Sequence, residues 1–437
     1  MDYKDKVISV QQAVDLVQSH DYIVTGLGAS TAHAFFSHLH TAADRLRHVT
    51  ISTCLPMADY PCFNDPAYRD SFLHDSWFYN AATRKAHKSG STSFVPNNLH
   101  FAAIRRLNHK QPRIYIGTAA MPDSHGYVSL SCSNTYEVQM IEAADIVILE
   151  INPNYPRTFG DLNVHLSRVH HLIEVDYPCP ALPYIEPNDK DRKIGELVAG
   201  LIHDGDCLQL GIGGMPNAVA EALKGKKDLG IHTEMLTTGM MELYKSGAVT
   251  GARKQIHKYK MVCTFIMGSE ELYAFAHDNP GIEVLAGSYV NDPYVVGQND
   301  NMVSINSTIE IDLTGQCASE SLGSTQFSGT GGQTDTAVGA QNAKNGRSFI
   351  CLYSTAMVRN PQTGEREEKS KIVPQLMPGA AVSLSRNDVD YVVTEYGAVR
   401  LRGTNIRERV ELLISIAHPK FREDLRQQAI ALGIITA

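Results

Sequence analysis

The sequence predicts an α/β fold built from two related domains with largely parallel sheets. Short apolar runs rich in Val and Ile recur along the chain. They alternate with longer segments of helical periodicity, which is typical of βαβ units. Segments of the first half also recur in the same order in the second half, which indicates an internal duplication. A chain of 437 residues is long enough for two or three domains of about 100 to 200 residues each.

The expected strands are the runs DYIVTGLG, RIYIGTAA, DIVILEIN, CLQLGIGG, NMVSINST and DYVVTEYG. A stretch with four prolines followed by charged residues, at 177–193, predicts the linker between the two domains. We therefore expect an N-terminal domain at residues 1–185 and a C-terminal domain at residues 186–437.

Four pairs of segments carry the internal repeat: 24–28 with 209–213, 49–53 with 229–233, 114–126 with 303–315, and 144–150 with 389–395. The second pair is followed by Cys54 in the first half and by Glu234 in the second half. Only the second half therefore has an acid at this strand end, as expected if a duplicated fold kept one active site. The fourth pair equates Glu150 with Glu395, which favours a structural role common to both.

Three later segments depart from the alternating pattern. Residues 319–335 are polar and rich in glycine, and they show no periodicity. Residues 358–371 predict an exposed turn or a β excursion. The C-terminal region has apolar spacing near 3.6 residues with a break at Pro419, which predicts two helices.

The composition excludes several classes of protein. Hydrophobic residues make up 43% and charged residues 20% of the chain, which is typical of a globular protein. A net charge of −8 argues against a generic nucleic-acid binder. No apolar run approaches the ~18 residues of a membrane helix, so we expect no membrane partner. The charged start MDYKDKVISV predicts no secretory signal.

The cysteines and histidines give no sign of a metal or a disulfide framework. The eight cysteines are scattered and form no CxxC, which is typical of reduced thiols in a cytoplasmic protein. HExxH is absent, and His165, His170 and His171 lack the i, i+4 spacing of a helical ligand pair. We therefore expect no metal site and a cytoplasmic location.

The first candidate binding motif is the run from Gly211 to Asn217, GIGGMPN, between an expected strand and a helix. Glycines allow a tight turn and a close approach to a ligand, and the helix N-terminus offers free N–H groups to an anion. A dinucleotide fingerprint would need glycine where Pro216 stands, but Glu234 lies near the distance of its ribose-binding acid. A nucleotide-dependent oxidoreductase therefore stays open, and so does a simple helix-entry turn without a ligand.

The second motif is the run SGTGGQ at 328–333. Such a loop can present several backbone N–H groups to one oxygen, as an oxyanion or phosphate requires. No GK[ST] follows, so the loop is not a P-loop. A flexible linker is the alternative, although strand-like segments flank the loop on both sides.

Three carboxylates complete the set of candidates. Glu234 follows an apolar run, at the strand end where α/β folds bind ligands, and we expect its carboxylate to be exposed there. Glu395 also follows an expected strand. Glu320 lies in the polar segment, where a solvated charge is the simplest expectation.

These motifs resemble those of the acetyl-CoA hydrolase/transferase group of family I coenzyme A transferases. The resemblance rests on EINPNYPRTFGD, GIGGMPNAV, GIHTEM, SGTGGQTD and TEYGAVRLRGTNIRERVELLISIAHPKFREDL, in order over almost the whole chain. It is strongest to members that act on 4-hydroxybutyryl groups, and next to members that act on butyryl and acetyl groups. The chain differs at 336–338, where the group has an aromatic and often a basic residue, and this leaves the acyl specificity open.

The resemblance implies the CoA-transferase fold and a covalent ping-pong mechanism. Glu234 would be the nucleophile that carries CoA as a glutamyl thioester. CoA would be a substrate, with no tightly bound cofactor, and the partners would be an acyl-CoA and a short-chain carboxylate. The resemblance implies that the group's substrate-binding residues are Gln209, Leu210, Gly211, Ile212, Gly213, Gly331, Gly332 and Glu395, the last of which would orient the acceptor acid. A homo-oligomer is expected from base rates.

Two further readings of the function remain beside the transferase and the oxidoreductase. An acyl-CoA hydrolase would use the same residues, with water in place of the acceptor acid. A ligand-binding α/β module would bind without forming a covalent adduct.

Overall fold

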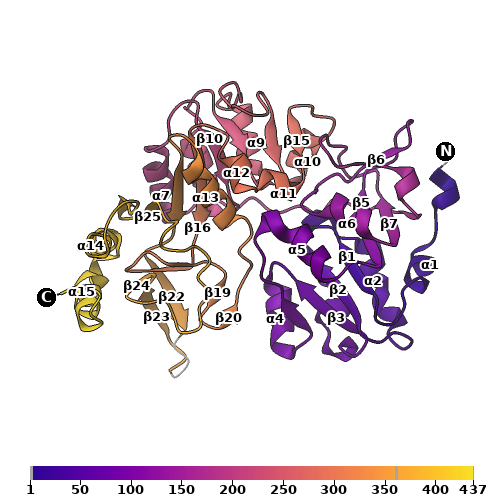
Figure 1. Cartoon of the computed structure of the whole chain (residues 1–437), viewed down its shortest axis with the longest axis horizontal. Coiled ribbons are helices and arrows are strands. Elements are labelled where there is room, and N and C mark those ends of the chain that lie inside the picture. The colour runs from indigo at the N-terminus through magenta and orange to yellow at the C-terminus, as the bar shows by residue number, and fades with distance from the viewer. Residues whose placement is uncertain (1–2, 360–362, 437) are drawn as a thin grey trace.

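Two large sheets form the framework of the chain in the computed structural model, which describes residues 3–359 and 363–436 (Figure 1). In the first sheet, seven strands pair in parallel throughout. Their spatial order is β4 (Thr92–Phe94), β3 (Phe72–Ser76), β2 (Val49–Thr53), β1 (Tyr22–Thr25), β5 (Ile114–Ala119), β7 (Ile146–Ile151) and β9 (His171–Glu174).

The second sheet has eight strands and is parallel except at one edge, where β25 and β26 form an antiparallel pair. Its order is β15 (Ile282–Val284), β13 (Met261–Cys263), β11 (Gly230–His232), β10 (Cys207–Leu210), β16 (Met302–Ser307), β21 (Arg347–Cys351), β25 (Tyr391–Thr394) and β26 (Gly397–Arg400). The predicted fold class, α/β with largely parallel sheets, is therefore confirmed.

The two sheets share one strand order, so each strand can be matched by position. β1, β2 and β5 occupy the positions of β10, β11 and β16, as the first three repeat pairs predict. The fourth pair is wrong, because β7 lies next to β5 and its counterpart next to β16 is β21, not β25. The D-x-V pattern shared by residues 145–147 and 390–392 is common to many buried strands. Glu150 and Glu395 therefore do not occupy equivalent positions.

The connection between the sheets is extended from residue 175 to residue 188 and then enters α7 (Asp189–Ala199). The predicted linker at 177–193 therefore ends too late. Asn188 caps the helix by accepting hydrogen bonds from the backbone of Lys190 and Asp191. This capping box makes the charged run a first helical turn. The domain limits 1–185 and 186–437 stay a prediction.

Helices cover the sheets and follow the strands in the chain. Those of the first half are α1 (Val10–Asp15), α2 (His33–Leu39), α3 (Pro61–Asn64), α4 (Ala81–Ser89), α5 (Ala102–His109) and α6 (Glu137–Ala143). After α7 come α8 (Gly214–Ala222), α9 (Thr238–Lys245), α10 (Glu270–Ala276), α11 (Gly287–Val290), α12 (Pro293–Val296) and α13 (Gln333–Asn342). In the described part of the chain, no helix is long and apolar enough to cross a membrane.

Short 3₁₀ helices and small sheets complete the fold. The 3₁₀ helices are η1 (Tyr3–Lys6), η2 (Gly28–Ser30), η3 (His40–Ala42), η4 (Pro66–Tyr68), η5 (Leu99–Phe101), η6 (Leu166–Arg168) and η7 (Pro419–Phe421). The small sheets pair β6 (Tyr127–Ser129) with β8 (Asn163–His165), β12 (Met235–Leu236) with β14 (Phe265–Ile266), β17 (Glu310–Asp312) with β18 (Cys317–Ala318) and β24 (Ile372–Val373), and β19 (Ser321–Leu322) with β20 (Thr325–Gln326).

Two of the later segments form as expected. β22 (Thr355–Arg359) and β23 (Arg366–Ser370) pair as an antiparallel hairpin, which is the predicted β excursion; residues 360–362 of that prediction lie outside the described residues. The C-terminal region forms α14 (Ile406–Ile416) and α15 (Arg422–Ala431), and Pro419 lies in the break between them.

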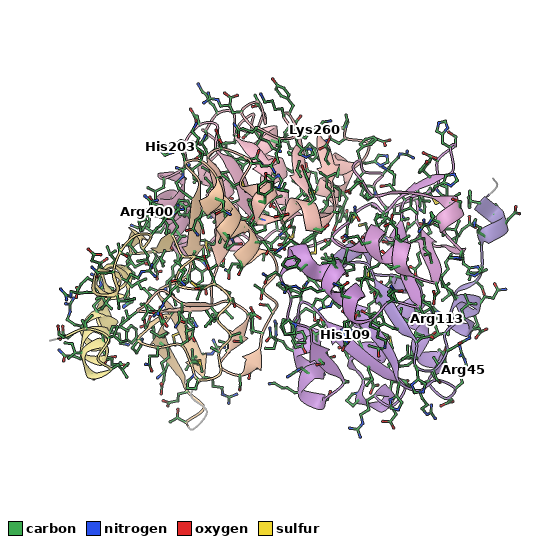
Figure 2. All side chains as sticks on the ribbon, viewed as in Figure 1. Arg45, His109, Arg113, His203, Lys260 and Arg400 are labelled. Carbon is green, nitrogen blue, oxygen red and sulfur yellow. The ribbon has the colours of Figure 1, made fainter. Side chains whose placement is uncertain are left out.

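One hydrophobic core joins the two halves. It contains Trp77 and Tyr136 of the first half together with Leu208 and Met235 of the second. Figure 1 shows the two sheets side by side, with α11 and α5 meeting between them. The basic side chains labelled in Figure 2, among them Arg45, Arg113, His203 and Arg400, come from both halves and are spread around the molecule.

The seam between the halves predicts a sensitive position at Gly160. This residue has φ +135°, and its backbone pairs with Val284 of the second half. A Cβ atom on Gly160 would overlap the Val284 carbonyl group. We expect Gly160→Ala to lower the melting temperature by at least 5 °C, which for a chain of this size is on the order of several kcal/mol.

Gly90→Ala is the matched control, because Gly90 has φ +79° but no atom lies within 4 Å of its Cβ position. It carries the backbone strain without the overlap and should lower the melting temperature by 2 °C or less, about 1 kcal/mol or below. Equal effects of the two substitutions, measured by calorimetry, would contradict the role assigned to the contact.

Candidate active site

A cavity of about 270 Å³ lies in the seam, where the carboxyl ends of strands from both sheets meet. β1 and β10 are the strands at which the two sheets reverse their order, and ligands bind at such switch points in parallel α/β sheets. Leu27, Cys54 and Leu55 reach the cavity from the ends of β1 and β2. Gln209 and Asn306 reach it from β10 and β16.

Most of the residues predicted to bind substrate come together here. Those that line the cavity are Gln209, Leu210, Gly211, Ile212, Gly331 and Gly332, together with Glu234. Gly213 lies beside it and lines an adjoining pocket. Glu395 lines neither of the two.

Hydrogen bonds hold both the backbone and the side chain of Glu234 in place. It stands between β11 and β12, and its carbonyl oxygen accepts hydrogen bonds from the backbone N–H groups of Thr264 and Phe265 at 2.9 and 3.2 Å. Its carboxylate Oε2 accepts a hydrogen bond from the Asn291 side-chain amide at 3.0 Å. The expectation that Glu234 is an exposed strand-end acid is wrong, because the surrounding cavity walls bury much of it.

Burial raises the pKa of Glu234 to about 7. The hydrogen bond from Asn291 opposes this rise, the nearby Asp335 carboxylate adds to it, and a hydrogen bond from the Gly332 backbone again lowers the pKa. A carboxylate in these surroundings holds its charge less readily than one in water and gains nucleophilicity. Such a perturbed acid in a cleft is a candidate for a functional group.

The glycine run 328–333 wraps around this carboxylate. Gly331 has φ +56°, and a Cβ atom on Gly332 would overlap both the Glu234 carboxylate and the Asn291 amide. Only glycine allows the backbone to come this close. Helix α13 begins at Gln333, so the carboxylate also lies at the positive end of a helix dipole.

The first half holds this glycine loop in place. The Leu99 backbone N–H donates to the Gly331 carbonyl oxygen at 3.3 Å. The Arg84 guanidinium donates to the Phe327 carbonyl oxygen at 2.8 Å and covers the Phe327 ring. His100 Nδ1 donates to the buried Asp335 carboxylate at 2.7 Å. The conformation of the loop is therefore fixed by contacts with both halves of the chain. The alternative that this segment is a flexible linker is wrong.

Glu395 is engaged away from the cavity. Its carboxylate accepts hydrogen bonds from the Ser354 N–H and hydroxyl, both at 2.8 Å, and pairs with Lys190 at 3.0 Å. Burial opposes its ionisation, but these partners outweigh burial and lower the pKa of Glu395. Through these contacts Glu395 connects α7 with the second sheet. A role of Glu395 toward an acceptor acid stays a prediction.

Glu320 differs from the expectation of a solvated charge, because it is buried and accepts a hydrogen bond from the Thr330 hydroxyl. Its backbone carbonyl also accepts from Phe327 and Ser328. The residue therefore braces the glycine loop from behind. Polar sequence alone suggested solvent, but the loop folds back over its own acid.

Comparison with known proteins identifies the family. Residues 1–183 match the acetyl-CoA hydrolase/transferase N-terminal domain, and residues 268–429 match the C-terminal domain of the same family. The chain belongs to the acetyl-CoA hydrolase/transferase family. The family resemblance found in the sequence is confirmed.

Proteins that are similar to almost the whole chain are named as CoA transferases. The chain is 42% identical to a succinyl-CoA:cyclohexane-1-carboxylate CoA transferase of Geobacter metallireducens, over 98% of this chain and 96% of the relative. It is 40% identical to a 4-hydroxybutyrate coenzyme A transferase of Clostridium kluyveri, over 98% and 97%. The crystal structure of a 4-hydroxybutyrate CoA-transferase from Porphyromonas gingivalis superposes with a TM-score of 0.80, at 35% identity over 98% of each chain.

Several residues in or next to the cavity could not be predicted from the sequence. Asn291 follows α11 in an unremarkable run, and nothing in the sequence places it beside Glu234. His100 and Asp335 are more than two hundred residues apart in the chain. Cys54 was identified as the counterpart of Glu234, but not as a wall of the same cavity. Among the described residues, no group of His, Cys, Asp or Glu is arranged to hold a metal ion.

The raised pKa of Glu234 predicts the pH dependence of stability. Because the folded pKa, about 7, lies above the unfolded value near 4.5, ionisation of Glu234 destabilises the fold progressively as pH rises from 4.5 to 7. Gln cannot ionise. We expect Glu234→Gln to match the wild type at pH 4.5 and to be more stable at pH 8 by on the order of 1–3 kcal/mol. Thermal unfolding across this pH range measures the difference.

Glu395→Gln is a control of opposite sign. Its folded pKa lies below the unfolded value, so the charged form contributes stability above pH 4.5 that is lost as pH falls. This variant should be less stable than the wild type at pH 8, and the difference should shrink below pH 4. A Glu234→Gln protein that loses stability at pH 8 would contradict the burial assigned to that carboxylate.

Proposed function

We propose that this protein is a CoA-transferase that moves CoA between an acyl-CoA and a short-chain carboxylic acid through a glutamyl-CoA thioester on Glu234. The observation that carries the proposal is the Glu234 carboxylate, which has a pKa raised to about 7 and is held against the Gly331–Gly332 backbone in the cavity between the two halves. The names of the full-length relatives support the same reaction class.

The first step forms an anhydride. An oxygen of the Glu234 carboxylate attacks the carbonyl carbon of the acyl-CoA thioester, and the C–S bond breaks, so that CoA leaves as a thiolate with the electron pair. Negative charge develops on the thioester oxygen during the attack. The backbone N–H groups of the glycine loop, at the N-terminus of α13, are donors of the kind that stabilise such an oxyanion.

The second step moves CoA onto the enzyme. The CoA thiolate attacks the glutamyl carbonyl carbon of the anhydride, and the bond between this carbon and the bridging oxygen breaks, so the oxygen and the electron pair leave with the acyl group. The acid leaves as a carboxylate, and Glu234 holds CoA as a thioester. Here the charge develops on the glutamyl oxygen, which the Asn291 amide faces. One unit of negative charge is carried through both steps, and no proton has to be supplied.

The return half-reaction repeats these steps with an incoming acid. Its carboxylate attacks the glutamyl-CoA thioester, the thiolate attacks the new acyl carbonyl, and the products are a new acyl-CoA and free Glu234. The residues at Gln209–Ile212 are the proposed CoA-binding backbone, because they form one wall of the cavity. The candidate acyl groups are acetyl, butyryl and 4-hydroxybutyryl, and the sequence resemblance favours the last.

Hydrolysis is the competing outcome, because water could attack the same glutamyl thioester. The two activities separate in one assay, in which CoA release from acetyl-CoA is measured with and without butyrate. A transferase forms butyryl-CoA with little net release of free thiol. Release that is equal in both conditions would identify a hydrolase.

The covalent intermediate predicts a CoA-sized mass on the enzyme. Incubation with butyryl-CoA should add CoA to the intact protein, and the adduct should be found in the peptide that contains Glu234, as mass spectrometry can establish. Glu234→Gln should show no adduct and lose at least about four powers of ten in kcat, since it removes the nucleophile.

An adduct on Glu320 or Glu395 would contradict the assignment of the nucleophile but leave a covalent transferase. Sequential kinetics with no adduct would contradict both. The reaction of the wild type should be ping-pong, since one acid leaves before the next one enters.

The glycine loop makes a separate prediction at Gly332. A methyl group there overlaps the far ends of the Glu234 and Asn291 side chains, which can shift without unfolding the protein. We expect Gly332→Ala to lower kcat about 100-fold, since small displacements of a reacting group have effects of this size. Gly225→Ala is the control, because no atom lies within 4 Å of the new methyl group. Full activity of Gly332→Ala would remove the loop from the site.

A further inference from the structure

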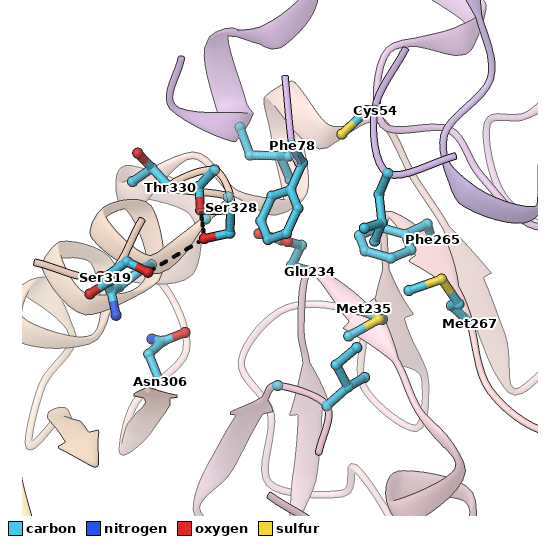
Figure 3. Close-up of a pocket in the computed structure, with 18 of the residues that line it drawn as sticks. Cys54, Phe78, Glu234, Met235, Phe265, Met267, Asn306, Ser319, Ser328 and Thr330 are labelled. Carbon is cyan, nitrogen blue, oxygen red and sulfur yellow. Dashed lines mark hydrogen bonds between the residues drawn. The ribbon is translucent and has the colours of Figure 1, made fainter. Parts of the chain in front are cut away.

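The two sides of the Glu234 cavity differ in chemistry. In Figure 3, Cys54, Phe265 and Met267 lie on one side of Glu234, and Ser319, Ser328 and Thr330 lie on the other. Leu27 and Leu55 also line the cavity. We call Leu27, Cys54, Leu55, Phe265 and Met267 the apolar wall.

The two sides also differ in depth. Four members of the apolar wall, Leu27, Cys54, Phe265 and Met267, are at most 5% exposed, and Leu55 is half-buried. On the polar side, Ser307 is exposed and Asn306, Ser319 and Ser328 are half-buried. A ligand that reaches Glu234 through the polar side therefore leaves its far end in contact with water, whereas one that enters the apolar wall is desolvated.

The backbone of Leu55 adds an independent observation. Leu55 has φ +52°, in the left-handed region that a bulky side chain rarely adopts. The preceding residue is held by its carbonyl oxygen, which accepts a hydrogen bond from the Gly28 N–H at 3.0 Å. Strain of this kind persists where the surrounding structure imposes it, and it is concentrated at functional sites. Here it keeps a leucine side chain on the cavity.

We propose, on the basis of the function proposed above, that the apolar wall binds the acyl group and restricts the enzyme to acids that carry neither a charge nor a hydroxyl group at their far end. The CoA thiol arm then lies on the polar side, where hydroxyl and amide side chains can bond its amide groups. The inference narrows the three candidate acyl groups toward unsubstituted aliphatic ones, and it disfavours the 4-hydroxybutyryl group that the resemblance suggests.

Charge supports this restriction most strongly. Glu234 is the one ionisable carboxylate among the residues that line the described cavity, and no Lys, Arg or His lines it. A second carboxylate on the acyl group, as in a succinyl group, would be buried without a cation and close to Glu234. An unpaired buried charge is far more costly than an unpaired hydroxyl group. Dicarboxylic acyl groups should therefore be rejected more strongly than hydroxylated ones.

The test compares acyl-CoAs that match in shape and differ in polarity. Succinyl-CoA is paired with 4-methylpentanoyl-CoA, since an isopropyl group has nearly the shape of a carboxylate. 4-Hydroxybutyryl-CoA is paired with pentanoyl-CoA, since a methyl group replaces the hydroxyl. The readout is the second-order rate constant for formation of the CoA adduct on the wild-type enzyme. We expect succinyl-CoA to react at least 100-fold more slowly than its partner, and 4-hydroxybutyryl-CoA roughly 10-fold more slowly.

Two substitutions then locate the acyl side. Met267→Ala enlarges the apolar wall and should change the ratio of the 4-methylpentanoyl to the acetyl rate constant at least five-fold. Ser328→Ala, on the polar side, should change both rate constants by one common factor. If Met267→Ala does not fold, Leu55→Gly serves instead, because glycine adopts φ +52° without strain and removes the side chain.

Succinyl-CoA that reacts as fast as 4-methylpentanoyl-CoA would overturn the inference. So would a change of acyl preference in Ser328→Ala with none in the apolar-wall variants. Both results would leave the transferase function intact, because an adduct still forms. An adduct with none of the four acyl-CoAs would overturn the proposed function and the inference with it.

Discussion

The rest of the site depends on one constraint, which is that a carboxylate is kept largely buried in the seam between the two halves of the chain. A buried charge needs donors, and Glu234 has the Asn291 amide and the Gly332 backbone on the same side. Neither donor could be close if the loop around Gly332 carried a side chain. The loop in turn keeps its shape because Leu99 and His100 of the first half hold it. The position of one side chain thus depends on contacts that come from both halves of the chain.

The duplication explains why the site lies in this seam and why it is asymmetric. Each sheet has its switch point at its central strand, and the two switch points open into the same cavity. Two facing acids there would repel each other, and one of them would stay protonated. Cys54 at the position equivalent to Glu234 avoids this conflict. Burial, with the Glu234 charge as a further cause, raises the pKa of its thiol, so the cysteine stays neutral and acts as an apolar wall.

The sequence predicted those features that depend on local pattern, and it missed those that depend on packing. Strand periodicity gave the parallel sheets, and the acid after β11 was identified because its strand had a counterpart in the first half. The match of Glu150 with Glu395 failed because buried strands look alike, and only neighbouring strands distinguish them. Glu320 was expected in solvent because nothing local shows that the glycine loop folds back over it. Asn291 and His100 could not be found, since their partners are distant in the chain.

The burial of Glu234 also affects whether CoA is transferred to an acid or released by hydrolysis. A glutamyl thioester is open to water as well as to an acid, so a transferase must keep water from one face while it admits a carboxylate. The side chains of the apolar wall offer water few hydrogen-bond partners on that side of the cavity. An aliphatic acid can bind against the apolar wall because burial of its hydrocarbon chain is favourable, whereas water gains no such stabilisation there. In the function proposed above, the apolar wall would select the substrate and protect the glutamyl thioester through the same physical property. A polar substitution in the wall should then weaken both the selection and the protection.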